Sequence, residues 1–425
     1  MFLCSLVLGL MVSPGAMAQI KDPQNRTLRP ADERVPEELR AQGLVYKGFV
    51  YNPSVVVETR YDSNILSQND DERSDYIVSI RPKLQVGKDY DGHRFSLEAS
   101  GNISRFAKRP EENSEEFSLS GGALINANSK WSFPLEIERS RTKRARNAPT
   151  PNALTRKPLN IDKFKGSIGV TRNFNRLSLT LQGEYQDVEF QDGVLNGGND
   201  VAVFSDDNRE VYGGELNLKY EIPRGRNSAD IEHSLFTTLA YSHQDNDTNS
   251  FVSGSFSGPS GDRDIAGLIA GFQTSYKGLL FARLGAGFIH QDFKESSLES
   301  TFDIDFLADI EYQIRPKISL YLQAEREIDQ DNGFVSGVEN SRFLLGTNYE
   351  IHHDLYLKAE TEYKNFDFKN ANREDDDFTG RIGLRYLNSR NIKSELDVSY
   401  TQRDSTVPVN EFDRFIFLLR LTGEI

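Results

Sequence analysis

The sequence contains a single cysteine, Cys4, among its 425 residues. Without a second thiol the chain can form neither an internal disulfide nor a thiolate metal site. It also has no long apolar run after residues 1–18, since hydrophobic residues make up only 37% of the chain and the mean hydropathy is −0.55. A membrane-spanning helix needs about twenty consecutive apolar residues. These two absences exclude a disulfide scaffold and a helical membrane protein.

Positive charge is also in deficit, with 50 Lys and Arg against 64 Asp and Glu, a net charge of −14. Because nucleic acid binds proteins through basic residues, this balance disfavours a nucleic-acid partner. The sequence has no Gly-rich phosphate loop, nucleophile elbow or His-Glu-x-x-His pattern. His352 and His353 fall in a predicted tight turn, where adjacent side chains rarely converge on one metal, so we interpret them as turn residues. We expect no enzymatic activity, no cofactor and no metal site.

The first residues do form a recognisable segment. Residues 1–18, MFLCSLVLGLMVSPGAMA, combine an apolar stretch with an Ala-Met-Ala cleavage site, which predicts a secretory signal peptide. The usual basic flank is missing, so we expect the natural start to lie a few codons upstream. Residues 19–45 are charged, contain three prolines and show no alternation. They predict a periplasmic lead-in, which could be a disordered tail, a plug or a docking segment for a partner.

From residue 46 to residue 425 the chain alternates apolar and polar side chains, as in Phe302, Ile304 and Phe306 against Asp303 and Asp305. A period of two is typical of strands with two different faces. The segments predict eighteen strands, at residues 49–61, 75–87, 93–106, 115–127, 131–141, 162–173, 175–188, 208–221, 231–244, 263–276, 279–292, 300–313, 316–328, 341–351, 354–367, 376–387, 391–403 and 411–423. The fold class is therefore all-β.

The links between these strands alternate in length. Tight links such as 126–130, 276–279 and 351–354 alternate with long, polar ones such as 191–208 and 246–262. Outer-membrane barrels have short periplasmic turns and long outer loops, whereas a soluble β-sandwich has no reason for this alternation. We therefore predict a transmembrane antiparallel up-and-down β-barrel of about 18 strands, in the outer membrane of a Gram-negative bacterium and in contact with its lipid.

Two short motifs resemble a known family. Tyr61, Asp62 and Asn64 follow the first predicted strand, and Ile80 and Pro82 lie in the second. This Tyr-Asp-x-Asn and Ile-x-Pro pairing resembles the outer-membrane family called Putative beta-barrel porin 2. The resemblance implies a porin-like barrel whose relatives often accompany exopolysaccharide synthesis and export. Some members look like the barrel half of an export channel that works with a periplasmic polysaccharide-export protein.

The predicted inward face carries charges of both signs. Our pore-lining candidates are Arg60, Arg81, Lys83, Arg94, Glu98, Arg283, Asp303, Asp305, Asp309, Glu311, Glu325, Glu327, Glu360, Glu362, Arg381 and Arg385. Paired carboxylates could indicate acid–base catalysis, but these simply follow the strand period, so a solvated pore wall explains them better. Acids are dense on the twelfth and thirteenth strands and bases on the first three and the sixteenth. A transverse field across the lumen would follow.

A basic segment, residues 139–158, contains seven cations and no acid: Arg139, Arg141, Lys143, Arg144, Arg146, Arg156 and Lys157. We place it in the long outer loop after the fifth strand. It would either bind lipopolysaccharide phosphates, which we favour, or fold into the lumen to attract an anionic polymer.

Three functions remain open at this point. The first is a conduit that exports a surface polysaccharide chain together with a periplasmic partner. The second is a general or substrate-selective diffusion porin, and the third is a structural or adhesive barrel. Inward aromatic residues, Phe236, Tyr321 and Tyr356, could also form a surface on which sugars stack.

Overall fold

The computed structural model describes residues 36–144, 146, 155–194, 201–202, 208–223, 231–246, 251–252, 255–256, 261–329, 338–368 and 372–425. The predicted signal peptide and most of the predicted lead-in lie outside these residues. Within the described part, no helix is long and apolar enough to cross a membrane.

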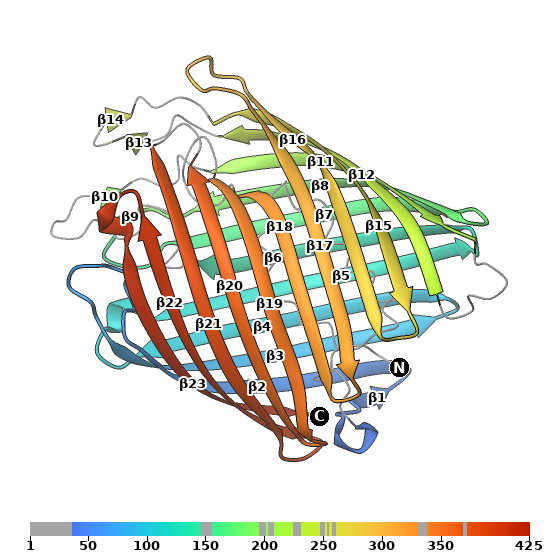
Figure 1. Cartoon of the computed structure of the whole chain (residues 1–425), viewed down its shortest axis with the longest axis horizontal. Coiled ribbons are helices and arrows are strands. Elements are labelled where there is room, and N and C mark those ends of the chain that lie inside the picture. Colours follow the sequence, from blue (N-terminus) through green and yellow to red (C-terminus); the bar gives the residue numbers. More distant parts are fainter. Residues whose placement is uncertain are drawn as a thin grey trace.

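Eighteen antiparallel strands close into one barrel, as the sequence predicts (Figure 1). In chain order they are β2 (Phe49–Asp62), β3 (Asp75–Tyr90), β4 (His93–Phe106), β5 (Ser114–Asn128), β6 (Trp131–Lys143), β7 (Asn160–Asn173), β8 (Leu177–Phe190), β11 (Arg209–Glu221), β12 (Ile231–Asn246), β15 (Arg263–Tyr276), β16 (Leu280–Phe293), β17 (Thr301–Arg315), β18 (Ile318–Asp329), β19 (Val338–His352), β20 (Leu355–Phe368), β21 (Arg373–Leu387), β22 (Ile392–Ser405) and β23 (Phe412–Glu424).

Short strands and helices lie at the two rims of the barrel. The outer loops carry the two-stranded sheets β9 (Gly193–Val194) with β10 (Val201–Ala202) and β13 (Phe251–Val252) with β14 (Ser255–Phe256), and the short helices η3 (Pro110–Glu112) and η6 (Pro408–Asn410). The opposite rim carries η2 (Glu37–Leu39) and β1 (Leu44–Tyr46). Figure 1 shows β1 and the C-terminus at one end of the barrel and β9, β10, β13 and β14 at the other.

Part of the predicted lead-in belongs to the sheet. β1 forms a hairpin with the start of β2, pairing Leu44 with Tyr51. Lys47 and Gly48 make the turn with positive φ angles, a conformation that glycine adopts without strain. The lead-in also contacts the same rim through its backbone, because Arg390 donates to the Glu38 carbonyl. The predicted boundary at residue 46 falls inside this hairpin, at the last residue of β1.

Each strand presents one apolar and one polar face. Side chains such as Leu181, Leu239 and Phe288 are about half exposed, while the side chains between them form hydrogen bonds and ion pairs on the other face. In a closed barrel the apolar face turns to lipid and the polar face lines the lumen. Tyrosines gather on the apolar face near the rims, for example the Tyr61–Tyr76 and Tyr185–Tyr212 ring pairs, each with 5.2 Å between centroids.

The barrel closes between its first and last strands, from Ser54 paired with Glu424 to Asp62 paired with Ile416. At the outer end, Arg414 donates to both oxygens of Asp62, and Asn64 Nδ2 donates to the Asp413 carbonyl at 3.0 Å. Asp62 and Asn64 are both fully buried. The Tyr-Asp-x-Asn motif therefore has a structural role, because it joins the two ends of the sheet.

Candidate transport lumen

Seven inward side chains on seven adjacent strands form one continuous hydrogen-bonded chain, which we call the polar belt. It crosses the closure between β2 and β23, and consists of Glu116, Asn102, Arg81, Glu58, Arg420, Glu395 and Arg385. The register brings these residues together, since Glu58 pairs with Arg420 and Glu395 pairs with both Arg420 and Arg385. Three guanidinium groups are matched with three carboxylates, so the belt is close to neutral.

Glu58 is the centre of the belt. Arg81 Nη1 and Nη2 donate to its two carboxylate oxygens at 2.9 and 3.1 Å, and Arg420 Nη2 donates to Oε2 at 3.0 Å. Arg420 also donates from Nη1 to Glu395 at 2.6 Å. The Glu58 side chain is only 2% exposed, whereas Arg81 is 36% exposed. The carboxylate is therefore fixed in the wall while the Arg81 guanidinium still faces the lumen, because charge-assisted hydrogen bonds are strong and directional.

A second charged cluster lies on β18 to β21. Arg342 donates to Glu325 at 3.0 Å and also to Glu362. Nearby, Glu360 accepts from Lys358 at 2.9 Å and from Tyr321 Oη at 2.8 Å. Here too each carboxylate is held beside a cation on a neighbouring position of the sheet.

The inward aromatic residues lie against the wall. The Tyr321 ring lies directly over Gly346, where an added Cβ would come within 2.2 Å of it. Phe236 covers Gly271 and Gly285 in the same way, with the Arg283 guanidinium 4.5 Å from its ring centroid. Phe236 and Tyr356 are buried. Tyr321 and Phe236 therefore pack over glycine, and the buried Phe236 and Tyr356 do not project into the lumen. A surface on which sugars stack stays a prediction.

All sixteen pore-lining candidates lie on the polar face of the wall. The structure brings together Arg81, Glu360, Glu362, Arg381 and Arg385 with acids or bases of neighbouring strands. Lys83 pairs with Glu98 at 3.0 Å, and Arg94 contacts Asp89 at 3.4 Å. The pairing reduces the charge separation on which the transverse field depends. Their role in transport, and the field itself, stay predictions.

Two residues at the centres of these charged clusters, Glu58 and Arg342, were not predicted from the sequence. Glu58 has the same parity as Arg60 and could have been found by the same alternation. Arg342 is harder to find, because the inward face of β19 also carries Leu344, which interrupts the polar pattern.

The basic segment is placed differently from the prediction. Arg139, Arg141 and Lys143 belong to β6, which continues beyond the predicted end because Arg141 donates to Asp162 of β7 through two bonds of 2.7 Å. Arg146 donates to Glu112 at 2.6 Å, and Arg144 lies 4.9 Å from the Phe190 ring, both largely buried. Arg139, Arg156 and Lys157 are exposed. Residues 145 and 147–154 lie outside the described chain, and lipopolysaccharide binding stays a prediction.

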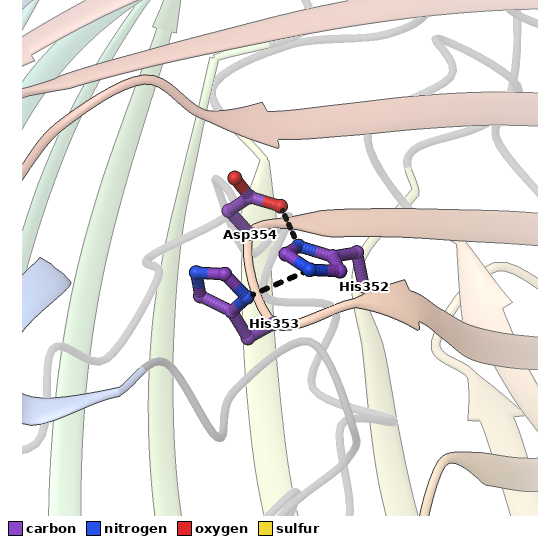
Figure 2. A group of neighbouring side chains, drawn as sticks. All are labelled: His352, His353 and Asp354. Carbon is purple, nitrogen blue, oxygen red and sulfur yellow. Dashed lines mark hydrogen bonds and ion pairs between the residues drawn. The ribbon is translucent and has the colours of Figure 1, made fainter.

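The turn between β19 and β20 brings His352, His353 and Asp354 together (Figure 2). His352 Nδ1 lies 2.6 Å from Asp354 Oδ1, and His352 Nε2 lies 3.2 Å from His353 Nδ1. The hydrogen bond with His352 lowers the pKa of the Asp354 carboxyl below its ordinary value. The two histidines lie at the tight turn, as the sequence predicts, and the structure also brings their side chains together with Asp354.

A cavity of about 780 Å³ opens on the same rim, between the turns that follow β3, β5 and β7. Its lining is mostly polar and includes the chain's only tryptophan: Asp91, Gly92, His93, Asn126, Ala127, Asn128, Ser129, Trp131, Ser132 and Asn173. Short turns mark the periplasmic rim, so this cavity faces the periplasm.

Comparison with known proteins gives a family, beside distant similarities to solved structures. No curated protein matches the sequence significantly. Among solved structures, the ferric citrate transporter FecA is 14% identical with a TM-score of 0.49, covering 83% of this chain and 60% of its own. The outer membrane protein opdK from Pseudomonas aeruginosa is 11% identical with a TM-score of 0.45, covering 88% and 99%. The chain thus spans 60% of the length of FecA.

The family model is more specific than these distant structures. The model of Putative beta-barrel porin 2 matches residues 37–424, which is nearly the whole described chain. Together with the closed barrel and its apolar outer face, this match places the protein in the Gram-negative outer membrane as a porin-like barrel. The chain belongs to the Putative beta-barrel porin 2 family.

Proposed function

We propose that this barrel is a non-enzymatic conduit through which a surface polysaccharide leaves the cell, in cooperation with a periplasmic export protein. The polar belt is the observation that supports this function most. A barrel of about eighteen strands encloses an aqueous lumen. A neutral belt of paired charges offers many hydrogen-bonding groups to a hydrated sugar chain. An ion-selective pore instead depends on rings of charge of one sign.

The pairing also fits passage better than tight binding. Arg81, Arg420 and Arg385 already have carboxylate partners, so a sugar hydroxyl can only replace or share existing hydrogen bonds. Such exchange has a small net free energy, since one set of hydrogen bonds takes the place of another. A polymer can then move along the wall without being trapped.

The test is the amount of surface and secreted polysaccharide in a strain that lacks the gene, beside the parent and a complemented strain. A large loss that the wild-type gene restores supports the conduit. Unchanged polysaccharide overturns it and makes the diffusion porin the leading function. Conductance of the purified barrel in a planar bilayer then measures that alternative directly.

The belt can be tested with one pair of variants. Glu395→Gln removes the carboxylate between Arg385 and Arg420 and should lower polysaccharide export several-fold. Glu115→Gln removes an exposed carboxylate paired with Arg105 outside the belt and should leave export unchanged. Both variants must first be shown to be folded. A folded barrel migrates differently in a detergent gel when the sample is not heated, so heated and unheated samples are compared. Equal export by the two variants would argue against a role for the belt.

We place the contact with the periplasmic export protein at the 780 Å³ cavity, because it opens on the periplasmic rim and includes Trp131. Tryptophan is enriched among residues that dominate protein interfaces. A photo-reactive residue in place of Ser129 should cross-link a periplasmic protein in the living cell. The same residue in place of Val409, which lies in the outer helix η6, is the control. Cross-linking at Val409 but not at Ser129 would reject this placement.

A further inference from the structure

The tight turn between β19 and β20 has the geometry of a small metal site. A β-bulge precedes it: the register moves from Glu350 opposite Tyr356 to His352 opposite Leu355, leaving Ile351 as an extra residue. Bulges change the direction in which the following side chains point. This bulge explains why two adjacent histidines, which alternate sides in a regular strand, lie on the same side here with ring centroids 4.0 Å apart (Figure 2).

The distance between the two facing nitrogens fits the coordination of one shared metal ion. His352 Nε2 and His353 Nδ1 are 3.2 Å apart. Two imidazole nitrogens that bind one tetrahedral Zn²⁺ at about 2.0–2.1 Å are separated by roughly 3.3–3.4 Å, the edge of the tetrahedron. Both histidines are exposed at the rim, so a metal ion can reach them from solution.

Asp354 completes the arrangement as an orienting group. Its carboxylate lies 2.6 Å from His352 Nδ1, on the side of the ring opposite to His353. A hydrogen bond from Nδ1–H to a carboxylate fixes the tautomer that has a free lone pair on Nε2. Metal-binding histidines usually have such a carboxylate partner on their second nitrogen. The three residues therefore supply two ligands and the group that orients one of them.

We infer that this turn binds a divalent transition-metal ion, Zn²⁺ or Cu²⁺, through His352 Nε2 and His353 Nδ1, with Asp354 as a positioning residue. The remaining coordination positions face the periplasm and take water. The site lies outside the polar belt, and it does not depend on the proposed transport function.

The test uses the whole barrel in detergent, purified without a polyhistidine tag. Calorimetric titration with Zn²⁺ measures affinity, and the electron paramagnetic resonance spectrum of bound Cu²⁺ reports how many imidazole nitrogens coordinate it. We expect two nitrogens in the wild type. His352→Ala and His353→Ala should each weaken Zn²⁺ binding by roughly 10-fold or more. His233→Ala, near the start of β12, is the control and should bind as the wild type does.

Asp354→Asn separates a positioning role from a structural one. It should weaken Zn²⁺ binding roughly 10–100-fold while the bound Cu²⁺ keeps its two-nitrogen spectrum. Wild-type affinity in His353→Ala, or a spectrum with fewer than two nitrogens in the wild type, would overturn the site. In that case the 3.2 Å contact is an ordinary hydrogen bond between two imidazoles.

Discussion

The two shortest strand pairings of the barrel are held in different ways. Between β2 and β23 the paired register ends at Asp62 and Ile416, and ion pairs of Arg414 and Arg420 reinforce it from the outer end to the middle. Between β17 and β18 the register ends at Leu307 and Glu325. Beyond this point, residues 301–306 of β17 pair with β16, and residues 326–329 of β18 pair with β19. Residues 301–306 and 326–329, all of them described, do not pair with each other.

A side chain bridges the interrupted pairing. Arg326 donates from Nη1 to the Ile304 carbonyl at 3.3 Å and from Nε to Ser341 Oγ at 2.9 Å, and forms an ion pair with Glu339 at 2.8 Å. The Phe306 and Phe343 rings stack at 5.6 Å across β18. A backbone carbonyl without a partner is costly in a membrane, so the guanidinium takes the place of a missing backbone donor.

The difference reflects how the strands are connected. β17 and β18 are joined by a tight turn, so their contact is local in sequence and its outer end can diverge. β2 and β23 lie at opposite ends of the chain, so bringing them together has a large entropic cost. Buried, directional ion pairs at the closure set the register that no turn can set.

The largest expected effect comes from breaking the closure. Asp62→Ala removes the carboxylate that Arg414 contacts inside the wall and should lower the free energy of unfolding by about 3–5 kcal/mol, because a buried charge loses its partner. Urea unfolding in detergent, followed by tryptophan fluorescence, measures this loss. Glu115→Ala, which breaks the exposed pair with Arg105, should cost less than about 1 kcal/mol. Equal losses in the two variants would contradict the role assigned to the closure.

A smaller loss is expected at the interrupted pairing. Arg326→Ala removes the donor shared by the Ile304 carbonyl and Glu339, and should lower the free energy of unfolding by about 1–3 kcal/mol. Hydrogen exchange should also become faster in residues 301–306 and remain unchanged in β15. Exchange that rises equally in both segments would mean that the effect is global and that Arg326 has no local bridging role.

Adding a side chain at Gly346, which faces Tyr321 of β18, should lower the free energy of unfolding less than Arg326→Ala does. Gly346→Ala places a methyl group where the Tyr321 ring lies, so the ring must move and its bond to Glu360 is lost. We expect a destabilisation of about 1–2 kcal/mol from this overpacking. Gly183→Ala, at a position with open space around its Cβ, is the control and should change stability little. A neutral Gly346→Ala would show that Tyr321 is not confined.

The smallest effect isolates one side-chain hydrogen bond. Tyr321→Phe keeps the ring over Gly346 but removes the hydroxyl that donates to Glu360 at 2.8 Å. The free energy of unfolding should fall by about 0.5–1.5 kcal/mol. A larger loss would indicate that β18 depends on this hydrogen bond as strongly as the closure of β2 with β23 depends on its ion pairs.

Sequence alternation was sufficient to predict every barrel strand, because a strand with one face in lipid and one in water must alternate with period two. The boundaries were less accurate where side chains extend a strand, as Arg141 does in β6 through Asp162. The candidate lumen was predicted as a set of inward charges. Its organisation was not, because whether Arg81 meets Glu58 depends on the register between strands.

The histidine turn shows the same limit on a smaller scale. The sequence placed His352 and His353 in a turn but not on one side of it, since the bulge at Ile351 arises from the pairing of β19 with β20. Likewise, the motif residues Asp62 and Asn64 were recognised as a signature, while their contacts with Arg414 and the Asp413 carbonyl join residues from opposite ends of the chain.

The sequence by itself determined the fold class, the strand count and the side of each strand that faces lipid, because these depend on local periodicity and composition. Only the tertiary structure decided which charges pair, where the wall is interrupted and how the barrel closes. These features depend on register and on contacts between residues far apart in the chain, and a change of register by two residues keeps the alternation while it changes every pair.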